Sequence, residues 1–300
     1  MKKAFIFTFL TILVASSCTK TVEFVGEDSA QRLVVLAEIE VGQNQPKISL
    51  QSTFSNADGP VYLSRRSIVD VYVNDELEPK SFRPDELTDD KSDWISGAEL
   101  KIEEGSEYRL LIDGSEKGFS VIEASSRVPV SGVLEVQDLS SPNIINTQNE
   151  TKSQFKLEFT ITDNDEISKY YHISPYLILN DGSKLFLDIE EILYSKNAII
   201  DLSHRHGILI DNSLVDETND VSLYMSVPHD FENLGLSSMF MHFELKTVPK
   251  DYFLYHRSIS QNVDAGASPF NLPTVTHTNF TSGYGLFATY AITLDSIAIN

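Results

Sequence analysis

The chain has 300 residues, of which 41% are hydrophobic and 10% aromatic, and its formal net charge is −21. This composition excludes a disordered chain, since it supplies apolar side chains for one large β domain or two domains of ordinary size. The negative charge argues against nucleic acid or anionic lipid as a partner, because the summed field repels both.

The amino-terminal segment has the three parts of a secretory signal peptide. Lys2 and Lys3 form the basic start, residues 4–14 are apolar but too few to span a bilayer, and small residues lead into Cys18. Cys18 is the only cysteine and stands where a lipoprotein signal peptide places its lipid acceptor. We expect diacyl or triacyl attachment there, through a diglyceride and palmitate, which holds a chain stably at a membrane. The alternative is an ordinary signal peptide cleaved near Ser17, with Cys18 there by chance.

Residues 1–17 are therefore the expected signal peptide, and the polar residues 18–30 the expected tether. Residues 33–41 then alternate, with Val35, Ala37 and Ile39 on one face and two glutamates on the other. Further strands, separated by Gly, Asn, Asp and Pro, are predicted at 47–54, 68–73, 108–112 and 119–128. This pattern favours an immunoglobulin-like antiparallel β-sandwich over residues 31–128.

The second half contains the clearest alternation of the chain, at residues 155–162. A helix is predicted after Pro249, which suits a first helical turn, because Tyr252, Tyr255 and Ile259 share one face. Other strands are predicted at 133–139, 170–179, 184–189, 207–210, 221–227 and 286–299. The fold class is therefore mainly β, with a larger C-terminal β-rich domain of residues 129–300 that contains at least one helix.

Several short motifs give the chain a resemblance to the family called domain of unknown function 4249. Besides Cys18, they are residues 33–35, 105–110, 128–130, 252–253, 269–270, 278–279 and 283–288. The resemblance implies an outer-membrane lipoprotein of Bacteroidetes-type bacteria, accessory to a TonB-dependent receptor. It implies no catalytic residue, because the family's activity is unknown. Surface-exposed members often carry acidic residues directly after the cysteine, whereas Glu23 is the first acid here, so the face of the membrane stays open.

Two groups of residues have the chemistry of metal ligands. The sequence His204-Arg205-His206 places two imidazoles near Asp201 and Asp211. No spacing fixes a third ligand, so a pair of surface histidines is the favoured interpretation.

The acidic stretches 163–166, 85–86 and 89–93 offer oxygens to calcium, and residues 163–166 lack the glycine and distal glutamate of a calcium loop. We interpret residues 163–166 as an Asx-rich turn and the other two stretches as a solvated loop, with calcium binding there as the alternative. No metal site is expected.

Residues 283–288, Gly-Tyr-Gly-Leu-Phe-Ala, match the dinucleotide fingerprint by letter. No βαβ unit surrounds them and a strand follows, so we expect an aromatic turn and no cofactor. No P-loop, nucleophile elbow or other catalytic residue is identified.

Aromatic residues gather towards the C-terminus, and most of them are expected in the core. The loop that carries Phe270, Phe280 and Tyr284 is the expected exposed exception, with a ligand or partner as its contact. The resulting hypothesis is a non-enzymatic binding or accessory partner of a TonB-dependent transporter, lipid-anchored at the outer membrane. The alternatives are a surface hydrolase of glycan or peptide, and a structural adhesin or fimbrial component.

Overall fold

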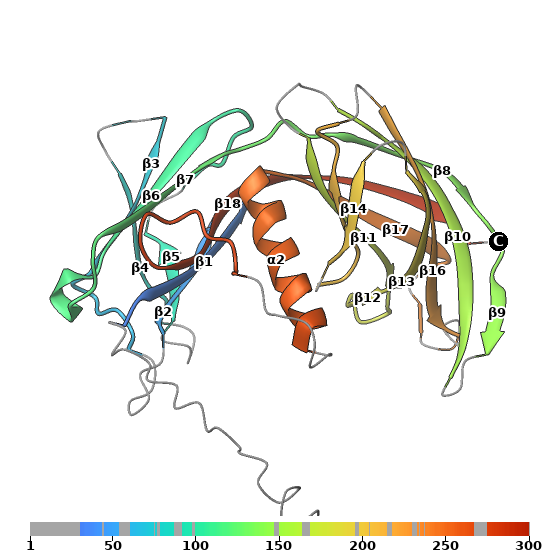
Figure 1. Ribbon diagram of the computed structural model, residues 1–300, viewed down its shortest axis with the longest axis horizontal. Helices are drawn as coiled ribbons and strands as arrows, with labels where there is room; N and C mark the ends of the chain where they lie inside the picture. The colour runs from blue at the N-terminus through green and yellow to red at the C-terminus, as the bar shows by residue number, and fades with distance from the viewer. Residues whose placement is uncertain are drawn as a thin grey trace, which may run out of the picture. The chain divides into compact units, whose positions relative to one another are not determined.

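A computed structural model describes residues 31–43, 45–53, 61–74, 76, 79–86, 92–97, 100–146, 150–163, 169–195, 198–203, 205–214, 218–229, 233, 235–236, 238–266 and 275–299. The fold is mainly β, as predicted, and the described residues include one α-helix, α2 (Lys250–Gly266) (Figure 1). Residues 31–300 form one compact unit. The immunoglobulin-like sandwich and the domain boundary at residue 128 stay predictions.

The larger sheet has thirteen strands in the order β14-β15-β11-β17-β18-β1-β2-β5-β4-β3-β6-β7, with β12 paired to β11. Its first group of strands is β1 (Leu33–Glu40), β2 (Lys47–Ser52), β3 (Ile68–Val73), β4 (Lys80–Pro84), β5 (Asp93–Ser96), β6 (Glu107–Asp113) and β7 (Ile122–Arg127), with a 3-10 turn, η1 (Ser115–Lys117), between the last two. Its second group is β11 (Tyr170–Ile178), β12 (Lys184–Phe186), β14 (Ile199–Leu202), β15 (Ile208–Asp211), β17 (Phe240–Val248) and β18 (Tyr284–Ala298).

The smaller sheet has five strands in the order β13-β16-β10-β8, with β9 paired to β10. These strands are β8 (Val133–Leu139), β9 (Asn143–Asn146), β10 (Thr151–Thr162), β13 (Asp188–Ser195) and β16 (Thr218–Pro228). All their pairings are antiparallel.

Strand β18 joins the two groups of the larger sheet (Figure 1). Its first half pairs in parallel with β1, from Val34↔Tyr284 to Glu40↔Tyr290, and its second half pairs antiparallel with β17. Gly285 makes the parallel approach possible: its φ is +113°, and a Cβ there would overlap the carbonyl oxygen of Val35. Residues far apart in the sequence therefore share one continuous sheet.

Three groups of buried apolar residues form the interior. Cluster 1 joins the inward faces of β1 to β7 and includes Phe280 and Phe287 from the C-terminal part. Cluster 2 lies between the five-stranded sheet and β11, β15, β17 and β18. Cluster 3 joins α2, through Tyr252 and Phe253, to the opposite face of the same strands, where Leu286 and Ala288 lie. Alternate residues of β18 thus pack into different clusters, as the two-residue period of a strand requires.

Most predicted elements are confirmed at or near their expected bounds. β3 and β8 coincide with residues 68–73 and 133–139, and Val35, Ala37 and Ile39 are fully buried. The helix begins directly after Pro249, whose carbonyl accepts the first turn's amide from Tyr252 at 3.1 Å. The strands that were not predicted are β4, β5, β9, β14, β17 and most of β13.

Candidate functional site

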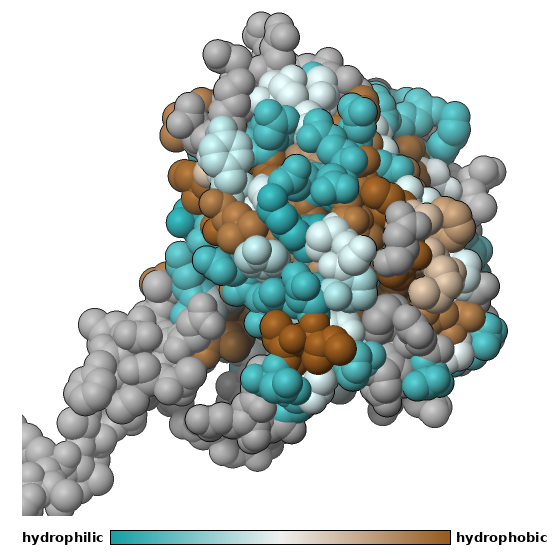
Figure 2. Space-filling view, turned by 90° about the vertical axis from the view of Figure 1, so that its right-hand side faces the viewer, coloured by the Kyte–Doolittle hydropathy of each residue, from teal (hydrophilic) through white to brown (hydrophobic). Residues whose placement is uncertain are grey.

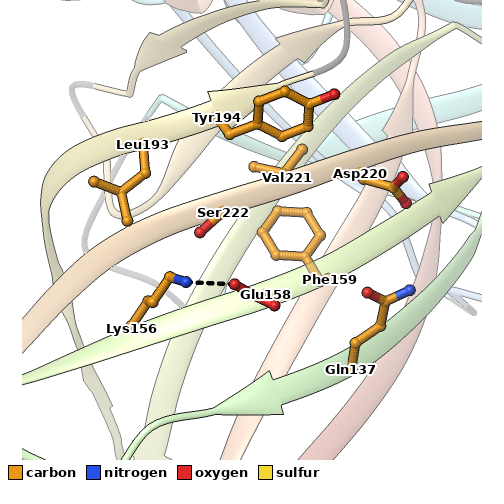
Figure 3. A pocket seen from close by; sticks show the side chains of 9 residues that line it. All are labelled: Gln137, Lys156, Glu158, Phe159, Leu193, Tyr194, Asp220, Val221 and Ser222. Carbon is orange, nitrogen blue, oxygen red and sulfur yellow. Dashed lines mark hydrogen bonds and ion pairs between the residues drawn. The ribbon is translucent and has the colours of Figure 1, made fainter.

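A groove of about 350 Å³ opens on the five-stranded sheet, across strands β8, β10, β16 and β13 (Figure 3). Figure 2, which turns the right-hand side of Figure 1 towards the viewer, shows polar and apolar side chains intermingled on that side. The groove is lined by Gln137, Lys156, Glu158, Phe159, Leu193, Tyr194, Asp220, Val221 and Ser222.

Two β-bulges shape the groove at the same level of the sheet. Ile192 pairs with Leu223 and Tyr194 with Ser222, so Leu193 is an extra residue in β13. On the other side the register also shifts between Glu158 and Phe159, which leaves Gln137 as an extra residue in β8. Bulges bend a strand and redirect its side chains, often beside functional sites.

The bulge in β13 explains why consecutive side chains are both exposed. Neighbouring residues of a regular strand point to opposite faces, yet Leu193 is 39% and Tyr194 55% exposed. Figure 3 shows this apolar pair on one side of the groove and Gln137 on the other, with β16 and β10 between them.

The polar side chains of the groove form two hydrogen-bonded groups. The Lys156 ammonium lies 2.5 Å from Oε1 of Glu158. The Thr160 hydroxyl donates to Oδ1 of Asp220 at 2.8 Å and accepts from the Gln137 amide at 2.5 Å. Within the described part of the chain, these contacts leave Oε2 of Glu158 and Oδ2 of Asp220 without a protein hydrogen-bond partner.

A second polar cluster lies between α2 and the larger sheet. Glu38 of β1 accepts hydrogen bonds from Nε2 of His256 at 3.0 Å and from Arg205 at 2.7 Å. Burial by itself raises the pKa of Glu38, but the hydrogen bond from His256 and the charges of His256 and Arg205 lower it to about 2. Both carboxylate oxygens are therefore engaged: Arg205 forms an ion pair with Glu38, and the hydrogen bond from His256 ties α2 to β1. Burial lowers the pKa of His256, so this second contact is a hydrogen bond rather than an ion pair.

His172 of β11 extends this cluster. Its Nε2 lies 2.9 Å from the carbonyl oxygen of His206, which only accepts, so Nε2 carries the proton and Nδ1 accepts the Tyr252 hydroxyl at 2.9 Å. Burial, followed by the charge of Lys246, lowers the pKa of His172 to about 3. The imidazole is neutral at neutral pH and holds β11 against α2 rather than carrying charge.

Replacing Glu38 with glutamine should lower the free energy of unfolding by about 1–3 kcal/mol at pH 7, because Arg205 loses its charged acceptor. The Glu38 carboxylate stabilises the fold above its ordinary pKa of 4.5, and this contribution is lost as the pH falls towards about 2. Urea unfolding at several pH values measures both effects. The control is Glu123→Gln in the exposed pair with Arg109, which should cost less than about 1 kcal/mol. An equal effect of the two substitutions at pH 7 would contradict the assignment.

The described residues of the predicted histidine motif, Arg205 and His206, contact protein groups. Arg205 pairs with Glu38, and the ring of His206 stacks on Phe186 at 4.4 Å between ring centres. His204 lies outside the described residues. Across the described ranges, no three His, Cys, Asp or Glu residues are grouped so that they can hold a metal ion.

The predicted acidic stretches are engaged by protein groups where they are described. Asp163, in the stretch 163–166, accepts hydrogen bonds from Lys169, Tyr171 and Asn212. In the stretches 85–86 and 89–93, Glu86 pairs with Arg65 and Asp93 with Lys47. Residues 164–166 and 89–91 lie outside the described part.

The three aromatic residues of the predicted partner loop differ in their positions. Phe280 is 7% exposed and belongs to cluster 1, whereas Tyr284 is 43% exposed and lies beneath the guanidinium of Arg32. Phe270 and the lipid-acceptor Cys18 lie outside the described residues. Ligand contact by the loop and acylation of Cys18 stay predictions.

Sequence reasoning did not single out the groove. Part of it was indicated by the alternation of β10, which places Lys156, Glu158 and Thr160 on the face opposite its apolar residues. No such pattern indicated Leu193 and Tyr194, because the bulges remove the alternation from β13.

The fold and the groove define a mainly β protein with a surface site of small-molecule size. The sequence matches Domain of unknown function (DUF4249) over residues 19–295, and the chain belongs to this family. No match to the chain was found among curated proteins. No helix in the described ranges is long and apolar enough to span a membrane.

Proposed function

We propose that this protein is an exported outer-membrane lipoprotein, anchored through Cys18, that serves as a non-enzymatic binding or accessory partner of a TonB-dependent transporter. The observation that carries the proposal is the position of the only cysteine, directly after a basic and apolar leader. The family match supports it, because the match begins at Thr19, the residue after the expected lipid acceptor.

A binding role suits the chemistry of the two polar sites. In the Glu38 cluster, the carboxylate and the imidazoles are already engaged in hydrogen bonds with other groups of the protein. The groove instead exposes Tyr194 and Leu193 beside paired charges, and ligand sites typically combine apolar area with a few oriented polar groups. The transporter as partner rests on the resemblance to lipoproteins that accompany TonB-dependent receptors.

Cys18→Ala should abolish incorporation of radiolabelled palmitate and move the protein from the membrane to the soluble fraction, because no second acylation site replaces the thiol. Labelling followed by gel electrophoresis and membrane fractionation measures both. Ser17→Ala is the matched control: it keeps the thiol and a small residue before the cleavage point, so labelling should persist. Palmitate in the Cys18→Ala protein would refute the anchor.

Affinity capture of the full-length protein from cross-linked native membranes tests the partner. Recovery of a TonB-dependent transporter at near-stoichiometric yield is the expected result, with the Cys18→Ala protein as a control for co-localisation. Turnover of a glycan or peptide that is abolished by one carboxylate substitution would favour the hydrolase instead. Covalent or high-mass ladders of the chain would favour the adhesin.

A further inference from the structure

The groove presents an exposed aromatic ring beside hydrogen-bonding groups of fixed position. The ring of Tyr194 is on the edge strand β13, and the carboxylates of Glu158 and Asp220 are on the central strands β10 and β16. An aromatic face attracts the slightly positive C–H groups of a ring stacked upon it. The ligand therefore has one face rich in C–H groups and polar groups around its edge.

The hydrogen-bonding capacity of the groove specifies that edge. Oε2 of Glu158 and Oδ2 of Asp220 accept hydrogen bonds, so the ligand supplies donors. Ser222 pairs across the sheet with both Glu158 and Tyr194, and its hydroxyl is buried from solvent without a hydrogen-bond partner among the described residues. Hydroxyl groups meet these requirements, because each one donates and accepts.

The charge of the groove excludes other ligand classes. Lys156 is paired with Glu158, which leaves the charge of Asp220 in a chain whose net charge is −21. A phosphate, sulfate or carboxylate ligand would be repelled. A wholly apolar ligand would bury the charged groups without hydrogen bonds, which is costly.

The shape of the edge strand disfavours an extended peptide. Strand addition needs a regular row of free backbone groups, whereas β13 is interrupted by register shifts at Ile189/Glu191 and Ile192/Tyr194. The volume of about 350 Å³ lies at the small end of the range for small-molecule sites and suits a short stretch of linked rings.

We propose that the groove binds a neutral glycan through one or two pyranose units, with Tyr194 as the stacking platform and the carboxylates of Glu158 and Asp220 as hydrogen-bonding groups. Glycan binding rests on the proposed binding role and specifies its ligand. The three strands that carry these residues are held by the sheet, so the site is formed before the ligand arrives.

The test uses detergent-solubilised full-length protein on an array of neutral, sulfated and uronic-acid-containing oligosaccharides, followed by calorimetric titration of the best ligand. Binding to neutral oligosaccharides is expected. Tyr194→Ala should weaken it about ten-fold or more, whereas Tyr194→Phe, which keeps the ring, should retain most of the affinity. Asp220→Asn should weaken it several-fold, because one acceptor is lost.

Tyr72→Ala is the matched control, since it removes a partly exposed tyrosine of β3 outside the groove lining and should leave binding unchanged. Unchanged melting temperatures establish that the variants are folded. Preference for anionic oligosaccharides, binding of peptides alone, absence of binding, or equal loss in Tyr194→Ala and Tyr72→Ala would each overturn the proposal. Palmitate labelling and transporter capture are separate measurements, so the anchor and the glycan site can fail independently.

Discussion

Gly285→Ala is expected to prevent stable folding, or to lower the free energy of unfolding by more than about 4 kcal/mol. The new Cβ would overlap the carbonyl oxygen of Val35, and the backbone at residue 285 has a φ of +113°, which side chains rarely adopt. The parallel pairing of β1 with β18 would have to open, and this pairing joins the two groups of strands in the larger sheet. Expression yield and urea unfolding measure the effect.

The variant Gly42→Ala distinguishes the cost of steric overlap from the cost of backbone strain. Gly42 also has a positive φ, +79°, but a Cβ there meets nothing within 4 Å. Its replacement should therefore cost only about 1–2 kcal/mol, the strain of a left-handed residue. Similar losses of unfolding free energy in Gly285→Ala and Gly42→Ala would show that the close approach of β18 to β1 adds nothing to the cost of backbone strain.

Acid is expected to destabilise the protein by up to about 5 kcal/mol through His172 alone, as the pH falls from 6.5 to about 3. The folded-state pKa is lowered from 6.5 to about 3 by burial and by the charges of Lys246, His256 and Arg205, although the His206 carbonyl opposes the shift. Between pH 6.5 and 3 the unfolded chain binds a proton at His172 and the folded chain does not. Each decrease in pH therefore lowers the free energy of unfolding. The stability that the fold has with a neutral His172 is fully present above pH 6.5 and is lost as the pH falls towards 3.

His172→Gln tests the assignment, because its side chain does not titrate. The variant should be less stable than the wild type at pH 7, since one of the hydrogen bonds to Tyr252 and His206 is lost. Its stability should fall less steeply between pH 6.5 and 3, by urea unfolding at fixed pH steps. His229→Gln, at an exposed position, controls for the removal of an imidazole. Equal slopes for the wild type and His172→Gln would contradict the prediction.

Alternation predicted the strands well where one face of the strand is buried. Phe155, Leu157, Phe159 and Ile161 are at most 1% exposed, as the pattern of β10 indicated. The same rule failed for β13, because two bulges break its period. β17 was not predicted, although Met241, Phe243 and Leu245 alternate along it and are fully buried. The alternation that predicts a strand was therefore present in this segment.

Glu38 and Glu40 show the limit of a local pattern. Alternation placed them on the face opposite Ile39, which is correct, and it gave no sign that this face is covered. Helix α2, more than two hundred residues later in the chain, covers this face and binds Glu38 through His256, while Arg205 supplies the ion pair. The glycines at 283 and 285 are a similar case, because their dinucleotide-like spacing reflects the approach of β18 to β1.

The sequence by itself determined the mainly β class, most strand positions, the helix after Pro249, the family and the case for a lipid anchor at Cys18. Each of these depends on residues that are close together in the chain, where period, turn chemistry and a single cysteine suffice. Only the tertiary structure decided the groove and the Glu38 cluster. Both join strands whose pairing is set by long-range packing and by bulges, and neither pairing nor bulge is encoded in a local period.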